Sequence, residues 1–294
     1  MAIYDQSYAP WSGTYASRAT RIRSIVEMEL AQPFKNIWVL LIVLLAFSLV
    51  LGWLLILFLV GSVQLNAIPA FALGNKIYRD GFFNFPPGSN FTLYSMILMV
   101  LSATVGSTLI ARDSRHRALL MYFSRSITRI DYLIGKFLSI FLFLLFVTLG
   151  PGLILFIGQL GMGSERLTFA QRMSDLLGVT LHSLIMTVPV SAVVLAFSSL
   201  TKRAYLAAIG WSMFYLASET ASSTLAFALK ADWAKALSWT NLTTHLASYC
   251  YVARAPSEPV LKCGWGVPLA VLLALTGASL SIVWWRLRSV EVEE

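Results

Sequence analysis

One run of the sequence constrains the fold more than any other feature. From Ile37 to Val60 it holds 24 consecutive residues without a charged side chain. As an α-helix this run is roughly 36 Å long, which is enough to cross the hydrocarbon core of a bilayer. Backbone groups inside hydrocarbon must hydrogen-bond within their own segment, so the run predicts a membrane-spanning helix. A cleaved signal peptide has a shorter apolar core nearer to the N-terminus, so we expect the span to be retained.

The composition extends this prediction to the whole chain. Of the 294 residues, 57% are hydrophobic and 12% are charged, whereas soluble domains average about 25% charged residues. We therefore predict an all-α membrane protein with a single domain, residues 1–294. Its six transmembrane helices are expected at about 37–60, 93–111, 133–158, 176–200, 204–229 and 266–285; Glu219 interrupts the fifth.

The positive charges predict the orientation of these spans. Fourteen of the 22 Lys and Arg fall in the segments on the same side as the N-terminus, and eight fall on the other side. Cytoplasmic connections are enriched in Lys and Arg. Both termini are therefore expected in the cytoplasm.

Two segments outside the spans have helical patterns. Residues 17–32 mix apolar and charged side chains before Pro33, which suggests an interfacial helix along the inner membrane surface; an ordinary juxtamembrane linker is the alternative. Residues 231–252, before the last span, are rich in Trp, Tyr and Leu. They predict one or two short helices that dip into the outer interface, as a re-entrant segment.

Between the second and third spans lies a basic connection, residues 110–136. It carries six positive side chains: Arg112, Arg115, Arg117, Arg125, Arg129 and Lys136. On a helix its apolar residues Ala118, Leu119, Tyr122 and Phe123 share one face. A short amphipathic helix of this kind can dock into the groove of a partner. The alternative is a basic surface loop that only fixes the topology.

This connection resembles the conserved region of ABC-2-type transporter permeases. The resemblance is carried by Asp113, Ala118-Leu119, Tyr122-Phe123-Ser124-Arg125, Thr128-Arg129, Tyr132-Leu133 and Gly135-Lys136. Arg117 stands where the family usually has Gly, and Ser126 where it usually has Pro. The family has six spans, an N-terminal interfacial helix, a cytoplasmic coupling helix and an outer re-entrant segment, so the resemblance covers nearly the whole chain.

The resemblance implies a permease subunit of an ATP-driven exporter in the bacterial inner membrane. Two such permeases, identical or related, would assemble with two ABC ATPase subunits, which would bind the ATP and Mg²⁺. A coupling helix near residues 114–123 would receive the motion of the ATPase. The residues implied in this coupling are Asp113, Arg115, Arg117, Leu119, Tyr122, Phe123 and Arg125.

The chain shows no catalytic motif of its own. It lacks the Gly-x-x-x-x-Gly-Lys-Ser/Thr loop that cradles phosphates and the His-Glu-x-x-His pattern of zinc sites. We therefore expect no enzyme activity, no metal site and no cofactor in this subunit. The basic balance of +8 is attributed to membrane topology and anionic lipid headgroups, not to nucleic acid.

Several polar residues in the predicted spans are candidates for a transport pathway. They are His182, Thr187 and Glu219, since polar groups at membrane depth are costly and often functional. The alternatives are hydrogen bonds between helices for the first two and an ordinary interfacial acid for Glu219. Ser102 and Gly106 form a small-residue face suited to close helix contact. Cys250 and Cys263 share the last outer loop and could form a disulfide.

The charges in the spans are few, which disfavours proton coupling and favours an amphiphilic or lipid-like cargo. Two other functions stay open at this level. One is a membrane anchor that recruits a cytosolic complex through the basic connection. The other is a secondary transporter.

Overall fold

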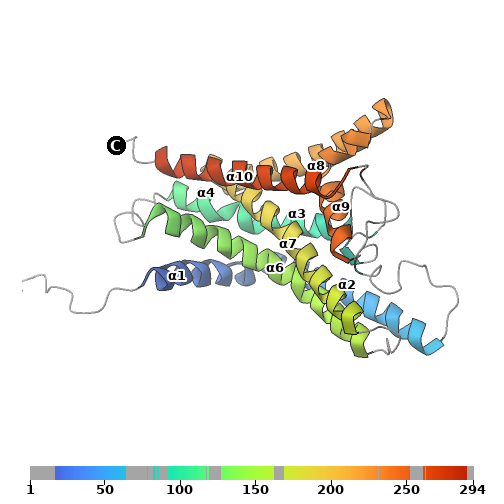
Figure 1. Ribbon diagram of the computed structural model, residues 1–294. Helices are drawn as coiled ribbons and strands as arrows, with labels where there is room; N and C mark the ends of the chain where they lie inside the picture. The colour runs from blue at the N-terminus through green and yellow to red at the C-terminus, as the bar shows by residue number, and fades with distance from the viewer. Residues whose placement is uncertain are drawn as a thin grey trace, which may run out of the picture.

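The computed structural model describes a bundle of helices. The described residues are 17–63, 78, 82–83, 85, 92–116, 118, 127–161, 169–230, 232–251, 261 and 263–289. Within these ranges there is no β-strand, which confirms the predicted all-α class. The long helices run roughly along one direction, with α9 crosswise at one end (Figure 1).

Five helical stretches are long and apolar enough to cross a membrane. They are formed by α2 (Ile37–Val63), by α3 (Leu93–Leu101) with η4 (Ser102–Gly106) and α4 (Thr108–Arg115), by α6 (Arg129–Gly161), by α7 (Phe169–Leu200) and by α10 (Gly266–Ser289). Each coincides with a predicted span, although α6 and α7 begin several residues earlier than expected.

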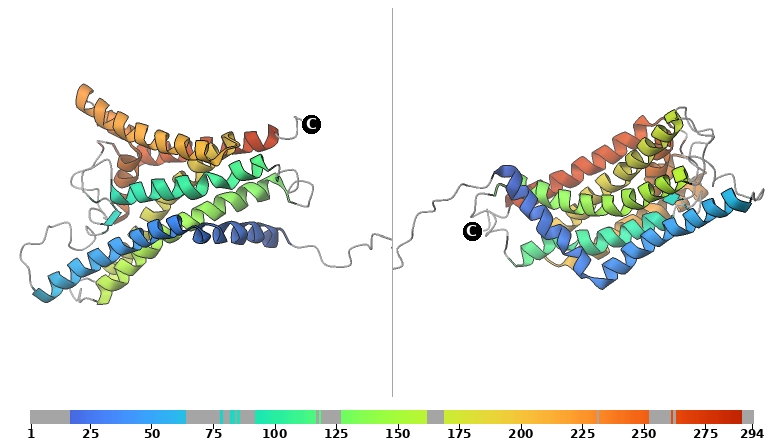
Figure 2. Two further views of the ribbon diagram at one scale, coloured as in Figure 1. Left: turned by 180° about the vertical axis from the view of Figure 1, so that it is seen from behind. Right: turned by 90° about the horizontal axis from the view of Figure 1, so that it is seen from below.

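The fifth predicted span is a helix with the predicted bounds, α8 (Ala204–Leu229), but it is not among these five. Glu219 and the Ser and Thr residues around it lower its hydropathy. The path of α8 through the bundle is nevertheless fixed by its two neighbours in the chain. The helix α7 ends near one end of the bundle and α10 begins at the other, and α8 runs between the two ends (Figure 2).

The shorter predicted helices are also present. Helix α1 (Arg18–Ala31) is capped by the Ser17 hydroxyl, which accepts from the Thr20 amide, and η1 (Pro33–Lys35) follows it before α2. The segment before the last span forms η5 (Asp232–Leu237) and α9 (Trp239–Tyr251). The sequence therefore placed both short helical regions correctly.

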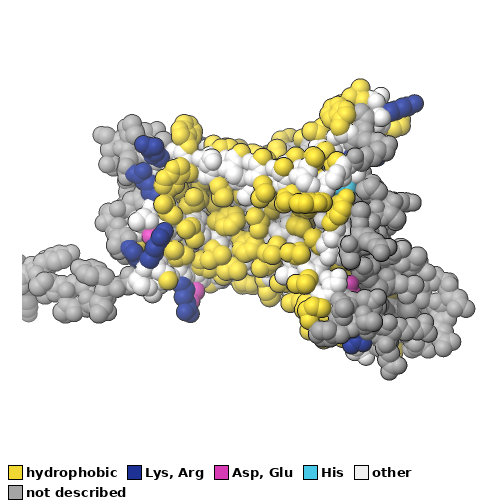
Figure 3. Space-filling view, viewed as in Figure 1, with side chains coloured by type: hydrophobic (Ala, Val, Ile, Leu, Met, Phe, Trp, Pro, Cys, Tyr) yellow, Lys and Arg dark blue, Asp and Glu magenta, His cyan; other side chains and the backbone are white. Residues whose placement is uncertain are grey.

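Helix α7 is the centre of the bundle, and α2 and α10 are at its periphery. In the most apolar part of α7, 72% of the residues are buried, against 22% in α2 and in α10. The exposed faces of the outer helices carry large apolar side chains, such as Leu44, Leu55 and Leu273. On the face seen in Figure 3, apolar side chains form a band across the middle of the bundle. An apolar surface of this extent is unfavourable in water and favourable in hydrocarbon.

Lys and Arg gather at one end of this band (Figure 3). We call it the basic end; α1 begins there, and α4 and α10 end there (Figure 1). Arg18, Arg112, Arg115 and Arg288 mark it in the sequence. The other end, which holds α9, is called the opposite end. The described chain termini and the flanks of the basic connection thus share one side of the apolar band, as the sequence predicts.

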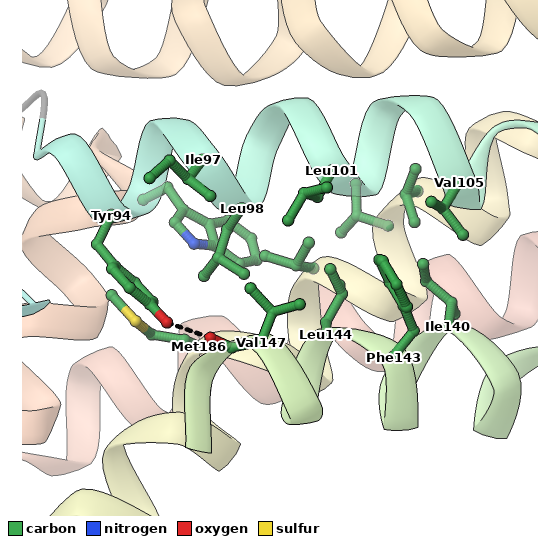
Figure 4. Close-up of a cluster of buried hydrophobic side chains, with 14 of the residues drawn as sticks. Tyr94, Ile97, Leu98, Leu101, Val105, Ile140, Phe143, Leu144, Val147 and Met186 are labelled. Atoms are coloured by element: carbon green, nitrogen blue, oxygen red, sulfur yellow. Dashed lines mark hydrogen bonds between the residues drawn. The ribbon is translucent and has the colours of Figure 1, made fainter. Parts of the chain in front are cut away.

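The core is built where α3 and η4 pack on α6 (Figure 4). Tyr94, Leu98 and Leu101 face Leu144 and other apolar side chains of α6, and the Tyr94 hydroxyl donates to the Val147 carbonyl. A Cβ added to Gly106 would lie 2.6 Å from Cγ1 of Val194 on α7. The close helix contact predicted from Gly106 is confirmed.

The second span contains a π-helical segment inside this core. This segment, η4, ends at Gly106, Ser107 keeps right-handed helical backbone angles, and α4 begins at Thr108. The first amides of a helix have no partner within it. Here the Ser198 hydroxyl of α7 accepts from the amides of Ile110 (3.0 Å) and Ala111 (3.1 Å), and it donates to the Ser107 carbonyl (2.8 Å). One side chain from a neighbouring helix thus hydrogen-bonds the backbone where the π-helical segment passes into α4.

Candidate functional site

The main candidate site is a group of buried charges at the basic end. Lys136, in the second turn of α6, is fully buried. Its ammonium group lies 2.6 Å from Oε1 of Glu29 on α1 and 2.7 Å from Oδ2 of Asp113 on α4. We call Glu29, Asp113 and Lys136 the three-helix charge cluster. It joins three segments that are far apart in the sequence.

Further polar contacts complete the cluster. The Tyr132 hydroxyl donates to Oδ2 of Asp113 at 2.8 Å, and its ring lies beside the Lys136 ammonium. The Arg112 guanidinium lies 3.9 Å from Oε2 of Glu29 and donates to the side-chain carbonyl of Gln32. Buried charges are stable only when they are paired and hydrogen-bonded. Arg112 brings a second positive charge close to the two carboxylates, which Lys136 alone does not neutralise.

Close packing fixes α1 against α6 at this site. A Cβ on Gly135 would lie 2.9 Å from Cγ2 of Ile25, so the absence of a side chain at Gly135 allows the two helices to approach. Beyond this contact, the Arg18 guanidinium donates to Oδ1 of Asp131 at 2.5 Å. Helix α1 is therefore held to α6 along its length and is attached to α4 through Lys136 (Figure 2).

The predicted coupling residues fall in two groups. Asp113 is buried in the cluster, and Arg115 is exposed as the last residue of α4. The others lie outside the described residues: Arg117, Leu119, Tyr122, Phe123 and Arg125. Asp113 and Lys136 of the cluster thus lie near the two ends of the basic connection, residues 110–136, which we call its base.

Sequence reasoning missed two members of the cluster. Glu29 lies in the predicted interfacial helix, and Lys136 belongs to the charges of the connection and to the motif of the resemblance, but the sequence predicts no pairing for either. A signal was present for Lys136, because a lysine one turn inside an apolar run requires a buried partner. The partner could not be read from the sequence, since Glu29 is 107 residues away.

The pathway candidates on α7 are buried within the bundle. The ring of His182 lies 4.2 Å from that of Phe83, and its Nδ1 is 3.1 Å from the Tyr251 hydroxyl of α9. The Thr187 hydroxyl donates to the Ser183 carbonyl one turn earlier in α7, at 2.7 Å. Both contacts join or stabilise helices, and a role in a pathway stays a prediction.

Glu219 is the second buried carboxylate site. Its two oxygens accept from the Ser238 hydroxyl (2.5 Å), the Thr240 amide (2.8 Å) and the Thr240 hydroxyl (2.9 Å). The Ser238 hydroxyl also accepts from the Asn241 amide. These donors surround the start of α9, so Glu219 caps that helix from α8. We call this arrangement the Glu219 clamp.

The possible disulfide between Cys250 and Cys263 is absent, because both residues are free cysteines. The Cys263 carbonyl contacts Nε2 of His245 on α9 at 3.0 Å. Cys250 lies five residues after His245 on α9, which is roughly 140° around the helix from the contact with Cys263. The Cys250 thiol therefore points away from Cys263. Burial raises the pKa of the Cys250 thiol to about 11, which leaves little reactive thiolate at neutral pH.

Other chemistry is not visible in the described part of the chain. Among those residues no group of three or more His, Cys, Asp or Glu could hold a metal ion. Comparisons of the chain with models of known protein families and with curated proteins gave no match. The helices, the three-helix charge cluster and the Glu219 clamp are therefore the features that bear on function.

Proposed function

We propose that this chain is the membrane-spanning permease subunit of an ATP-driven exporter of the ABC-2 type. The observation that carries the proposal is the three-helix charge cluster. It ties the base of the basic connection to α1 and to the start of α6, so a force applied to the connection would reach two other elements at once. A basic surface loop that serves only topology needs no such attachment.

In this proposal α8 is the sixth span. It has 26 residues, and its exposed face carries Tyr205, Ile209, Met213 and Phe214. With α8 included, both described termini and the basic connection lie on the cytoplasmic side, as the positive charges favour. The chain would lie in a bacterial inner membrane beside a second permease, with η5 and α9 at the outer interface.

The motor is a separate protein in this proposal. Two ABC ATPase subunits would bind ATP and Mg²⁺ and press on the basic connection, with Arg115 at its exposed start. The cluster would pass the movement to α1 and α6. An amphiphilic or lipid-like cargo suits helices whose exposed side chains are mainly apolar, and it would move between two permeases.

The test begins with purification of the chain from its native membrane in a mild detergent. We expect an ATPase subunit to co-purify, and its ATP hydrolysis to rise several-fold in the presence of the chain. Recovery of cytosolic proteins without an ATPase would contradict the proposal and favour a membrane anchor. Cargo uptake that is abolished by an uncoupler and needs no ATP would favour a secondary transporter.

A pair of variants locates the contact. Arg115→Glu reverses an exposed charge at the start of the basic connection and should reduce the stimulation of ATP hydrolysis at least threefold. Arg23→Glu is the matched control, because Arg23 is exposed on α1 and its charge partner, Glu27, is on the same helix and not in the basic connection. Equal losses in both variants would show that net charge, and not the connection, controls the stimulation.

A further inference from the structure

An open groove lies on the surface between α7 and α9, near the opposite end. It has a volume of about 680 Å³, which is within the range of binding sites for small molecules. Met173, Leu177 and Leu181 of α7 form one wall, and Leu246, Tyr249 and Cys250 of α9 form the other. Ser174 and Trp265 add the polar atoms of a hydroxyl and an indole.

The two helices that form the groove are firmly packed on each other beside it. Helices α7 and α9 meet where Gly178 faces Tyr251, and a Cβ on Gly178 would lie 2.4 Å from the tyrosine ring. The Tyr251 hydroxyl is hydrogen-bonded to Nδ1 of His182, and its ring stacks on that of Tyr78. Tyr251 is buried and cannot swing into the groove. The hollow beside this contact is therefore a feature of the packed bundle and does not depend on an unusual side-chain rotamer.

The groove has the depth of one bilayer leaflet. Along α7 it extends from Met173 to Leu181, about 12 Å of helix, and the apolar span of α7 begins at Arg172. One leaflet contributes about 15 Å of hydrocarbon. The groove therefore starts where the span starts and follows the direction of a lipid chain.

The side chains are graded along this direction. Ser174 lies near the start of the span, and Trp265 directly precedes α10. Trp and Tyr side chains favour the level of the lipid headgroups. Leu177 and Leu181 lie deeper in the span and are exposed, although they are large and apolar. A molecule with a polar head and one long apolar chain matches this order of side chains.

From these observations we infer that the groove binds one acyl chain of a bilayer phospholipid from the leaflet at the opposite end. Its walls belong to a membrane-spanning helix and to the crosswise helix α9, so it opens toward hydrocarbon. The bound chain would fill the space between α7 and α9 and hold the position of α9. The inference rests on the membrane location of α7 and not on coupling to an ATPase.

The chain supplies its own reporter for a first experiment. Cys250 lines the groove, whereas Cys263 does not. The Cys263→Ser protein, purified in a rigid steroid detergent without alkyl chains, is labelled with an excess of N-ethylmaleimide at pH 8.5, over a time course long enough to label Cys250 despite its raised pKa. We expect dioleoylphosphatidylcholine to slow the labelling of Cys250 at least fivefold. In the matched Cys250→Ser protein, the labelling of Cys263 should change less than twofold.

A second experiment counts the retained lipid. Native mass spectrometry of the wild-type protein should detect about one tightly held phosphatidylcholine per chain after exchange into the same detergent. Leu177→Trp fills the groove and should lower this occupancy at least fivefold. Met213→Trp, at an exposed site on α8, is the control and should leave it unchanged.

The outcomes separate this inference from the proposed function. Equal protection of both cysteines by lipid, or equal lipid retention in both tryptophan variants, would overturn the groove as a lipid site, even with an ATPase bound. Protection of Cys250 alone would support the site, even if no ATPase were recovered. If Leu177→Trp fails to fold, the thiol experiment decides alone, because Cys263→Ser changes no residue that lines the groove.

Discussion

The two ends of the bundle solve the same physical problem in different ways. Each end buries carboxylates, and a buried carboxylate needs compensation. At the basic end Glu29 and Asp113 are paired with the Lys136 cation, across segments up to 107 residues apart. At the opposite end Glu219 is paired with neutral donors that lie 19 to 21 residues away in the sequence.

The difference bears on what each end can do. Charge pairing is long-ranged and makes the basic end sensitive to any change of net charge, such as the approach of a charged partner. The Glu219 clamp is local, and it makes α8 and the start of α9 one structural unit. The basic end is therefore suited to receive a signal, and the opposite end to keep its shape.

The largest predicted effect comes from removal of the cation. Lys136→Met removes the buried cation that Glu29 and Asp113 share and leaves the exposed Arg112 near them, so it should lower the free energy of unfolding by about 3–5 kcal/mol. Thermal unfolding of the protein in detergent measures this loss. The triple variant Glu29→Gln, Asp113→Asn, Lys136→Met is the control: it leaves no unpaired charge and should regain most of the stability. A single variant as stable as the wild type would show that the cluster is not an ion-pair site.

The same comparison predicts a smaller cost at Glu219. Glu219→Ala leaves the Ser238 and Thr240 donors without an acceptor and should cost about 2–3 kcal/mol. Glu219→Gln retains one acceptor oxygen and should cost about half as much. Hydrogen exchange of the amides at the start of α9 should rise in the alanine variant, while α1 stays unchanged. A loss of protection in α1 would mean that the two ends are not independent.

Packing at the opposite end gives the next prediction. Gly178→Ala would push a methyl group into the Tyr251 ring and should cost about 1–3 kcal/mol. Gly52→Ala in α2 is the matched control, because no atom lies within 4 Å of its added Cβ. That substitution should be neutral or stabilise by up to about 1 kcal/mol. Equal effects of the two substitutions would contradict the close contact of α7 and α9.

The smallest effect concerns pH. His245 Nδ1 accepts from the Leu261 amide, and Nε2 contacts the Cys263 carbonyl. Burial lowers the pKa of His245 below its ordinary value, so the neutral ring stabilises the fold. This contribution is complete above pH about 6.5, the pKa of an unfolded histidine, and is lost as the pH falls through the lower folded value. Thermal unfolding at pH 7.5 and 5 should differ less in His245→Gln than in the wild type.

Much of the fold could be predicted from the sequence, because local patterns determine it. Uninterrupted apolar runs placed the spans, and Ser17 and Pro33 bound the first helix at the predicted positions. The π-helical segment before Ser107 could not be predicted, since the backbone there is hydrogen-bonded to the Ser198 hydroxyl of another helix. Of the three-helix charge cluster, the sequence implies a coupling role only for Asp113. The sequence indicates that Lys136 needs a buried partner, but that this partner is Glu29 is a tertiary contact that no local pattern shows.

The hydroxyl of Ser198 has one more consequence. Where the π-helical turn of the second span passes into α4, the backbone is hydrogen-bonded to the Ser198 hydroxyl of the central helix α7. Helix α4 ends at Arg115, within the basic connection. In the proposed function, a force on the basic connection would reach α7 through this hydroxyl as well as α1 and α6 through the three-helix charge cluster. In Ser198→Ala the amides of Ile110 and Ala111 would lose this acceptor, and the contact between α4 and α7 would be weaker.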